Sequence, residues 1–192
     1  VNTVVVGAGQ AGLAMSAHLR DHQIDHVVLE RDSIAERWRN ARWDSLVMNG
    51  PAWHDRFPTR HFDCDPNGFP DKDEVTRYFE DFAQQIEAPI KCGVEVKGTV
   101  AMPQGGYQVE TSQGNFHADH VVAATGPFQI PVIPPIVPEG VVNQLHSVNY
   151  HNPGQLPDGA VMVVGAGSSG AQIADELLRS GRKVFLSIGP HD

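Results

Sequence analysis

The chain has 192 residues, enough for one sizeable hydrophobic core or for one core and part of a second. Hydrophobic residues make up 41% and charged residues 19%, with no apolar run long enough to cross a bilayer, so we predict a globular protein with no membrane partner. The net charge of −9, with scattered lysines and arginines, argues against a nucleic-acid partner.

Cysteine usage indicates free thiols and not disulfides. Cys64 and Cys92 lie 28 positions apart without a CxxC motif, which is typical of a reducing compartment, so we expect a cytoplasmic location. The sequence contains no HExxH motif, and we expect no metal site. It opens directly on a strand, without the pattern of a signal peptide or an initiator Met, so we expect a few residues before it.

The opening of the chain has the pattern of a strand, a glycine turn, a helix and a second strand. The valines at 4–6 are typical of a strand that is buried on both faces. A helix is expected over 10–22 and a second strand over 25–30. Residues 31–71 are irregular, but their aromatic content argues for an ordered and functional loop.

The middle of the chain predicts one helix and a β-meander. The helix is expected over 73–87, capped by Asp71 or Asp73. The meander strands are expected near 94–102, 107–112 and 115–124. A proline-rich connector follows over 127–138.

Residues 160–189 repeat the opening pattern of strand, glycine turn, helix and strand. The fold class that we predict is therefore α/β. A Rossmann-type dinucleotide-binding domain with a β-meander occupies 1–138, and a second, incomplete Rossmann domain begins over 139–192. The short second sheet predicts an open edge that pairs with the rest of a polypeptide or with another copy.

The first glycine turn is Gly7-Ala8-Gly9-Gln10-Ala11-Gly12. In a dinucleotide-binding turn the first glycine allows the tight turn, the second lets a pyrophosphate approach the backbone, and the third lets the helix pack on the strand. Glu30 follows at the end of the next strand, where a carboxylate accepts hydrogen bonds from a ribose diol. The alternative is a tight turn with a solvated Glu30.

The second glycine turn is Gly165-Ala166-Gly167-Ser168-Ser169-Gly170. Its second strand is expected to end at Ser187, the place that we assign to Glu30 in the first repeat. A serine does not repel a 2′-phosphate and can donate a hydrogen bond to one, which favours NADPH over NADH.

The sequence resembles the class B flavin-dependent monooxygenases, which include flavin-containing, YUCCA-type and Baeyer–Villiger enzymes. The resemblance spans nearly the whole chain. It depends on GAGQAG at 7–12, ERWRNARWDSLVMNGP at 36–51, FPDKDEVTRYF at 69–79, VVAATGPFQIPVIP at 121–134, LHSVNY at 145–150 and VVGAGSSGAQIADEL at 163–177.

The resemblance implies FAD in the first site, NADPH in the second, and insertion of one oxygen atom from O2 into a small organic substrate through a flavin C4a-peroxide. It implies that Asn49 is a catalytic residue near the flavin and the nicotinamide; the alternative is a turn-forming asparagine. The expected FAD contacts are Gly7, Gly9, Gln10, Ala11, Gly12, Glu30, Arg31, Trp38, Arg39, Trp43, Thr125 and Gly126. The expected NADPH contacts are Gly165, Gly167, Ser168, Ser169, Gly170 and Ser187.

The roles of the tryptophans and arginines in this region have alternatives. For at least one tryptophan in the 38–43 segment, the alternative to lining the FAD site is packing in the core. For Arg39 and Arg42, the alternative to contacting phosphate is covering the aromatic rings. The family pattern Phe-x-Gly-x-x-x-His-x-x-x-Trp/Asp is degenerate here: His146 is present, but Gly140 and Val142 occupy the first two places. The degeneracy favours a YUCCA-like or flavin-containing-monooxygenase-like enzyme over Baeyer–Villiger chemistry.

Two other functions stay open. One is a flavin reductase that passes electrons from NAD(P)H to an acceptor, although the absence of CxxC argues against a thioredoxin-reductase type. The other is a truncated flavin-binding module without catalysis. We expect the chain by itself to bind FAD but not to turn over.

Overall fold

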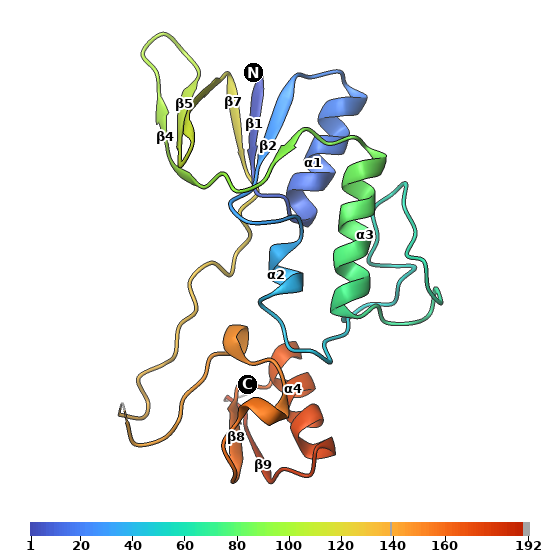
Figure 1. The fold of residues 1–192 in the computed structure, drawn as a ribbon, viewed down its shortest axis with the longest axis vertical. Coiled ribbons are helices and arrows are strands. Elements are labelled where there is room, and N and C mark those ends of the chain that lie inside the picture. Colours follow the sequence, from blue (N-terminus) through green and yellow to red (C-terminus); the bar gives the residue numbers. More distant parts are fainter. Residues whose placement is uncertain (139, 190–192) are drawn as a thin grey trace.

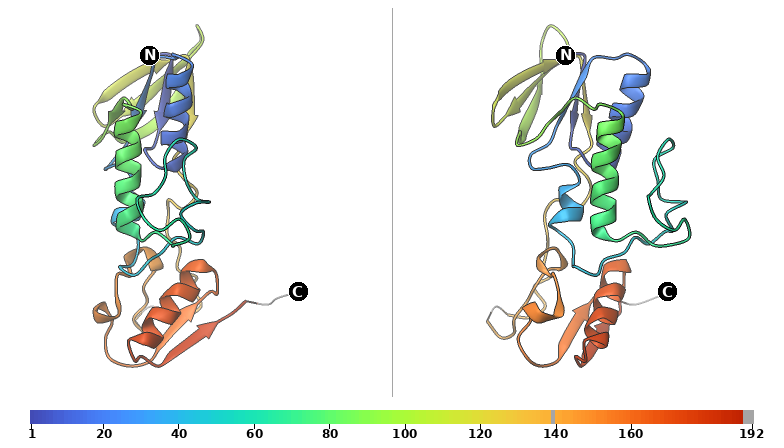
Figure 2. Two further views of the ribbon diagram at one scale, coloured as in Figure 1. Left: turned by 90° about the vertical axis from the view of Figure 1, so that its right-hand side faces the viewer. Right: turned by 45° about the vertical axis from the view of Figure 1, so that its right-hand side comes forward.

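The computed structural model describes residues 1–138 and 140–189. Figure 1 and Figure 2 show a larger unit and a smaller unit stacked end to end and joined by an extended connector. The expected domain boundary at residue 139 lies outside the described residues and stays a prediction. The helices and strands are β1 (Thr3–Val6), α1 (Gln10–Asp21), β2 (His26–Leu29), α2 (Glu36–Arg39), α3 (Lys72–Gln85), β3 (Ile90–Lys91), β4 (Val96–Ala101), β5 (Tyr107–Thr111), β6 (Gly114–Ala118), β7 (His120–Ala123), η1 (Ser147–Asn149), η2 (Pro153–Gln155), β8 (Val161–Val164), α4 (Ser168–Arg179) and β9 (Val184–Ser187).

A parallel sheet of four strands, in the order β3-β2-β1-β7, forms the centre of the larger unit. β1 pairs on both sides, so its valines have no solvent-facing edge, and Val4 and Val5 are fully buried. Leu13 of α1 is also fully buried. The predicted α/β class is confirmed, with the carboxyl ends of β1, β2 and β7 at one edge of the sheet.

The predicted strand over 115–124 is wrong, because two strands in two different sheets occupy this stretch. β6 completes a three-stranded antiparallel sheet with β4 and β5, and β7 joins the parallel sheet. The chain changes sheets at Asp119. The amides of Asp119 and His120 both donate to the carbonyl oxygen of Asn2, at 3.0 Å each, which draws the chain from one sheet to the other.

Helix α3 anchors the long loop between α2 and α3. Phe57 of this loop stacks on Phe82 with 3.9 Å between ring centroids, and its amide donates to the hydroxyl of Tyr78 at 2.6 Å. Tyr78 in turn donates to the carbonyl oxygen of Arg60 at 2.8 Å. The loop is therefore packed against the helix and ordered.

The helices predicted over 10–22 and 73–87 end one and two residues earlier in the structure than expected. α1 and α3 end at Asp21 and Gln85, because the turn that follows each helix contains a left-handed residue, Gln23 (φ 55°) and Glu87 (φ 44°). A left-handed residue ends the helical hydrogen-bond ladder and turns the chain away.

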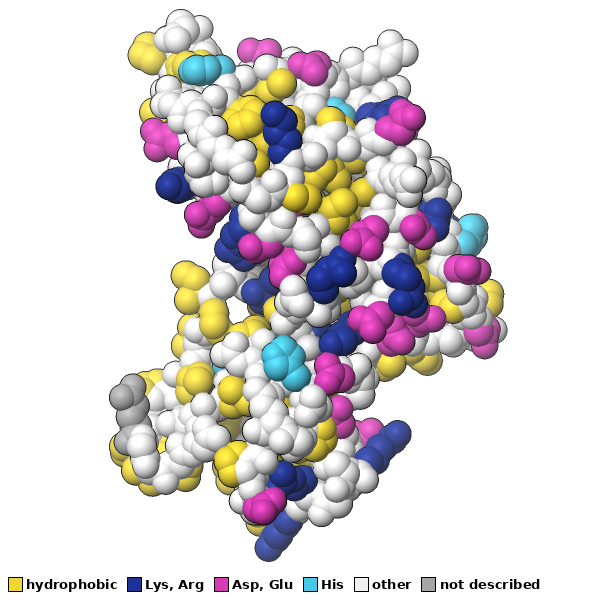
Figure 3. Space-filling view, viewed as in Figure 1, with side chains coloured by type: hydrophobic (Ala, Val, Ile, Leu, Met, Phe, Trp, Pro, Cys, Tyr) yellow, Lys and Arg dark blue, Asp and Glu magenta, His cyan; other side chains and the backbone are white. Residues whose placement is uncertain are grey.

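The smaller unit consists of β8, β9 and α4. The two strands pair in parallel, and α4 covers one face of the pair with the buried side chains of Ile173 and Leu177. Met162 and Phe185 on the strands are 64% and 48% exposed. Figure 3 shows hydrophobic side chains over the connector beside this unit, and mixed acidic and basic side chains at the level of α2 and α3.

The two units meet at the segment 43–49, which follows α2. Trp43 and Leu46 pack with Tyr150, Ile173 and Leu177 in one buried cluster. The hydroxyl of Tyr150 donates to the carboxylate of Glu176 on α4 at 2.6 Å. Burial and the neighbouring carboxylate raise the pKa of Tyr150, so the hydroxyl keeps its proton.

Asp44 ties this segment to two other parts of the chain. Its carboxylate accepts from Lys72 at the start of α3 and from Asn152, the residue before η2, both at 2.9 Å. The hydrogen bonds from Asn152 and Lys72 lower the pKa of Asp44 below its ordinary value.

A first prediction concerns the capping box of α3. The side chain of Asp71 accepts from the amides of Asp73 and Glu74, and Glu74 accepts from the amide of Asp71. Replacing Asp71 with Ala should lower the free energy of unfolding by about 1–2 kcal/mol, measured by urea denaturation. Asp73→Ala, which removes only a charge near the helix end, should cost less. An equal loss in the two variants would contradict the capping role.

A second prediction concerns the pH dependence of the Asp44 contacts. A lowered pKa means that the stabilisation is complete above the unfolded-state pKa of about 4 and is lost as pH falls through the lower folded-state value. At pH 7 the free energy of unfolding of Asp44→Asn should therefore be lower than that of the native chain, by at most about 1 kcal/mol because the carboxylate is largely exposed. The difference in unfolding free energy between the two should disappear in acid. A difference in unfolding free energy that stays constant into acid would contradict the role of the Asp44 carboxylate.

Candidate functional site

The first glycine turn brings α1 close to the end of β1. Gly7 has φ of +107°, and a Cβ there would lie 2.5 Å from the carbonyl oxygen of Ala124, just beyond β7. A Cβ at Gly12 would lie 1.8 Å from the carbonyl oxygen of Gly7. Backbone conformation and packing thus explain the first and third glycines.

Gly9 needs a different explanation. Its φ of −89° and ψ of −167° are open to any residue, and a Cβ there would meet nothing within 4 Å. Nothing in the described chain requires a glycine at this position. The open space in front of Gly9 is what a ligand needs if its phosphates are to approach the backbone amides.

The helix that follows has an uncapped N-terminus. Gly9 is the N-cap of α1, and within the described residues this helix has neither a side-chain hydrogen bond at its cap nor an acidic residue in its first turn. α3, by contrast, is closed by the carboxylates of Asp71 and Glu74. The free amides and the positive end of the helix dipole leave α1 ready for an anion.

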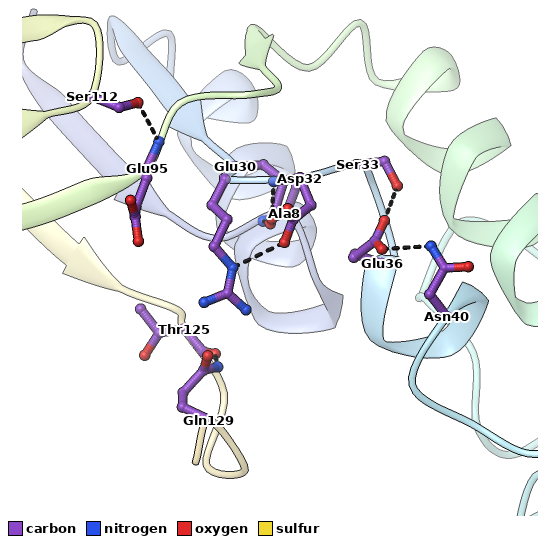
Figure 4. Close-up of polar contacts among 11 residues, drawn as sticks. Ala8, Glu30, Asp32, Ser33, Glu36, Asn40, Glu95, Ser112, Thr125 and Gln129 are labelled. Carbon is purple, nitrogen blue, oxygen red and sulfur yellow. Dashed lines mark hydrogen bonds and ion pairs between the residues drawn. The ribbon is translucent and has the colours of Figure 1, made fainter. Parts of the chain in front are cut away.

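Glu30 lies beside the first turn. Its carboxylate accepts from the amide of Ala8 at 2.8 Å and from the amide of Asp32 at 3.0 Å, one bond to each oxygen (Figure 4). A carboxylate has about four acceptor positions, so two remain for ribose hydroxyls. Glu30 therefore holds the glycine turn in shape and keeps the capacity to bind a sugar.

The second glycine turn has the same geometry. A Cβ at Gly170 would lie 1.8 Å from the carbonyl oxygen of Gly165, and Gly167, with φ of −70°, has nothing within 4 Å of its Cβ position. Gly167 is the N-cap of α4, without a side-chain cap among the described residues. The amides of Ser168 and Ser169 begin this helix, so α4 also offers an open anion site.

The strand register corrects one sequence assignment. Val6 pairs with Leu29, and Val164 pairs with Ser187, so Ser187 is equivalent to Leu29. Ile188, 56% exposed, occupies the place of Glu30. The first repeat thus has a carboxylate at this place and the second has an apolar side chain. The NADPH expectation depends on two properties of Ser187. Ile188 shares the first, the lack of a negative charge, but it lacks the second, a hydroxyl that could donate a hydrogen bond to a 2′-phosphate.

The chain after β7 borders the first site. Thr125 follows Ala124, whose carbonyl oxygen lies against Gly7, and Gly126 has φ of +78°. The side chain of Gln129 donates to the carbonyl oxygen of Thr125, and Figure 4 shows both residues beyond the end of β7. Gln129 was not expected from the sequence.

Gln10 and Trp38 line a small pocket at the head of α1. Its other lining residues are Met48, Asp55, Arg56, Phe57, Tyr78 and Phe79. The structure therefore brings Trp38 to the first turn. Ala11, the next residue of α1, is exposed at the head of the helix.

Three arginines of the expected FAD region have partners within the chain. Arg31 pairs with Asp32 at 2.9 Å, and Arg39 pairs with Glu80 of α3 at 2.5 Å. The guanidinium of Arg42 lies 5.6 Å from the ring centroid of Trp38, which agrees with the alternative that it covers an aromatic ring. Phosphate contacts by these arginines stay predictions.

Trp43 and Asn49 lie where the two units meet. Trp43 is 3% exposed in the shared cluster, and its indole N–H has no partner among the described residues. Core packing accounts for its burial, and its contact with FAD stays a prediction. Asn49 is exposed and lies within hydrogen-bond distance of Gln172 on α4. Gln172 was missed, although it follows the second glycine motif beside the buried Ile173.

Two negative findings complete the survey of the described residues. His18, His22 and His26 recur at a spacing of four, but no group of three histidines, cysteines or acids in this part of the chain could hold a metal ion. None of the helices described is long and apolar enough to span a bilayer.

The family model for pyridine nucleotide-disulphide oxidoreductases matches residues 4–191. An uncharacterised CzcO-like oxidoreductase of Geobacillus kaustophilus is 45% identical over 98% of this chain and 54% of its own length. The indole-3-pyruvate monooxygenase YUCCA1 of Oryza sativa is 31% identical over 96% of the chain and 47% of its own length. The chain thus spans about half the length of the curated relatives that it matches.

Solved structures give the same result. A flavin monooxygenase variant from Stenotrophomonas maltophilia superposes with a TM-score of 0.87 at 26% identity, covering 100% of this chain and 58% of that one. A bacillithiol disulfide reductase from Staphylococcus aureus also reaches 0.87, over 100% of this chain and 58% of that one, but at 16% identity it shows the fold alone. The chain belongs to the pyridine nucleotide-disulphide oxidoreductase family, and its similarity to flavin monooxygenases confirms the resemblance found in its motifs.

Proposed function

We propose that this chain forms the FAD site and the first part of the NADPH site of a flavin-dependent monooxygenase. The whole protein would insert one oxygen atom from O2 into a small organic substrate. The observation that carries the proposal is the pair of uncapped helices, α1 and α4, each begun by a glycine whose Cβ position is empty. Of the three described helices of 12 residues or more, only α3 is closed by its own carboxylates, while α1 and α4, which belong to the two repeats, are left open.

The first site fits FAD better than NADPH. Glu30 supplies acceptors for an adenosine ribose diol, and a carboxylate at this place disfavours a 2′-phosphate. The corresponding place in the second repeat is Ile188, which presents no negative charge. We therefore assign FAD to the head of α1 and NADPH to the head of α4, with residues 1–138 and 139–192 as the corresponding domains.

The chain's own residues bind, orient and exclude water. The amides at the head of α1 would hold the diphosphate, Glu30 would hold the ribose, and Trp38 with Met48 would supply apolar surface beside Gln10. Bound flavin supplies the redox chemistry and the activation of oxygen. Asn49 donates hydrogen bonds where flavin and nicotinamide meet.

A reductase with the same two sites is the second candidate, favoured by the fold that the chain shares with bacillithiol disulfide reductase. Substrate-dependent oxygen uptake by the whole protein, with one oxygen atom recovered in the product, supports the monooxygenase. NADPH oxidation that needs an electron acceptor and leaves oxygen unconsumed would support the reductase.

A third prediction uses the two equivalent glycines as a matched pair. Gly9→Val should still fold, because the backbone angles and the space permit a side chain, and should lose only the modest stability that a poorer N-cap costs, yet it should weaken FAD binding by at least about tenfold. Gly167→Val makes the same change at the second turn and should leave FAD affinity unchanged. FAD affinity is measured by quenching of flavin fluorescence. Equal affinities in the two variants would refute the assignment of FAD to α1.

A fourth prediction concerns Glu30. Glu30→Ala removes the acceptor for the Ala8 amide and for the ribose, and it should weaken FAD binding about 10- to 100-fold, as expected for the loss of charge-assisted hydrogen bonds. Glu110→Ala, on the exposed side of β5, removes the same charge and serves as the control. The measurement is isothermal titration with FAD, and an affinity equal to that of the control would show that Glu30 does not contact the cofactor.

A further inference from the structure

Gln172 of α4 contacts the segment that carries Asn49. Its Oε1 accepts from the amide of Val47 at 3.3 Å. Its Nε2 donates to the carbonyl oxygen of Val47 at 3.0 Å and to Oδ1 of Asn49 at 3.4 Å. The side chain of Gln172 therefore forms hydrogen bonds with both backbone groups of Val47 and with the side-chain amide of Asn49.

The backbone of Val47 fixes the orientation of both amides. An N–H can only donate and a carbonyl can only accept, so Gln172 must present Oε1 to the first and Nε2 to the second. Asn49 then meets a donor and must present its oxygen. Oδ1 and Nδ2 diverge from one carbon atom, so Nδ2 turns away from Gln172, and in the described structure it has no hydrogen-bond partner.

The backbone around Asn49 is held on its other side as well. The amide of Met48 donates to the carbonyl oxygen of Pro70 at 2.8 Å, and Leu46 is buried against α4. With the backbone anchored from two directions, the remaining freedom of Asn49 is largely the rotation of its side chain. Gln172 is the group that selects one side-chain amide orientation.

We propose that Gln172 is a positioning residue, which directs the Nδ2 donors of Asn49 away from α4 and toward the junction of the two cofactors. The proposal deepens the proposed function and rests on it for the identity of those cofactors. Gln172 links α4, the helix of the second nucleotide site, to Asn49, the side chain that we assign to the flavin. A single side-chain amide thus fixes the orientation of Asn49 relative to both sites.

The test compares Gln172→Glu with Gln172→Leu. The carboxylate of the first variant still accepts from the amide of Val47, but it can donate neither to the carbonyl oxygen of Val47 nor to Asn49, and it repels Oδ1. Asn49 should respond by rotating its amide, so that Nδ2 donates to the carboxylate. The leucine variant removes every one of these bonds and should leave the Asn49 amide unfixed. Leu178→Glu, at a 64% exposed position of α4, controls for added charge.

The first readout is NMR of the side-chain amides in the 15N-labelled chain without cofactor. In the native chain the amide protons of Gln172 should exchange slowly with water and those of Asn49 rapidly. In Gln172→Glu the Asn49 protons should become several-fold slower, with no change in Leu178→Glu. Unchanged exchange at Asn49 in Gln172→Glu would overturn the positioning role, whatever the flavin does.

The second readout is the reduction potential of FAD bound to the same chain. A donor turned away from the flavin stabilises the reduced, more negative form less, so Gln172→Glu should shift the potential to a more negative value, equivalent to about a three- to tenfold change in the reduction equilibrium. Rotation of Asn49 without this shift would overturn the link to the flavin. A native chain that fails to bind FAD would overturn the proposed function instead, while the NMR result would stand by itself.

Discussion

The structure depends on one close backbone contact that occurs twice. Gly12 and Gly170 each lie so near the carbonyl oxygen of the first glycine of their motif that a Cβ would come within 1.8 Å of it. This contact brings the first turn of a helix directly over the end of a strand, which points its free amides at the space beyond the sheet. The open N-termini of α1 and α4 and the empty space at Gly9 and Gly167 follow from it.

The cofactor sites that we propose at α1 and α4 could serve redox chemistry only if they are held at a fixed distance. The segment 43–49 does this in the described structure, because its apolar side chains pack in the cluster between the units and its backbone is bonded to Gln172. Asp44 adds links to Lys72 and Asn152. Figure 1 shows the connector running outside the two units as an extended chain. The contacts of segment 43–49 with α4 join the units directly.

Much of this architecture could be predicted from the sequence, because the glycine motifs report local geometry. Both turns, the helices that follow them and the paired strands lie within a few residues of their expected positions. The long-range features could not be predicted. The break at Asp119 depends on Asn2, which is 117 positions away, and the offset between Ser187 and Ile188 appears only in the strand register. Gln172 contacts Val47 and Asn49, which are 125 and 123 positions earlier, a pairing that no local pattern contains.

The central claim is that the open head of α1 binds the diphosphate of FAD. A crystal structure of the chain grown with FAD tests it most directly. The account predicts the diphosphate within hydrogen-bond distance of the amides at the head of α1, and the adenosine ribose on the carboxylate of Glu30. A diphosphate bound at the head of α4, with α1 left free and Glu30 still turned only to Ala8 and Asp32, would contradict it.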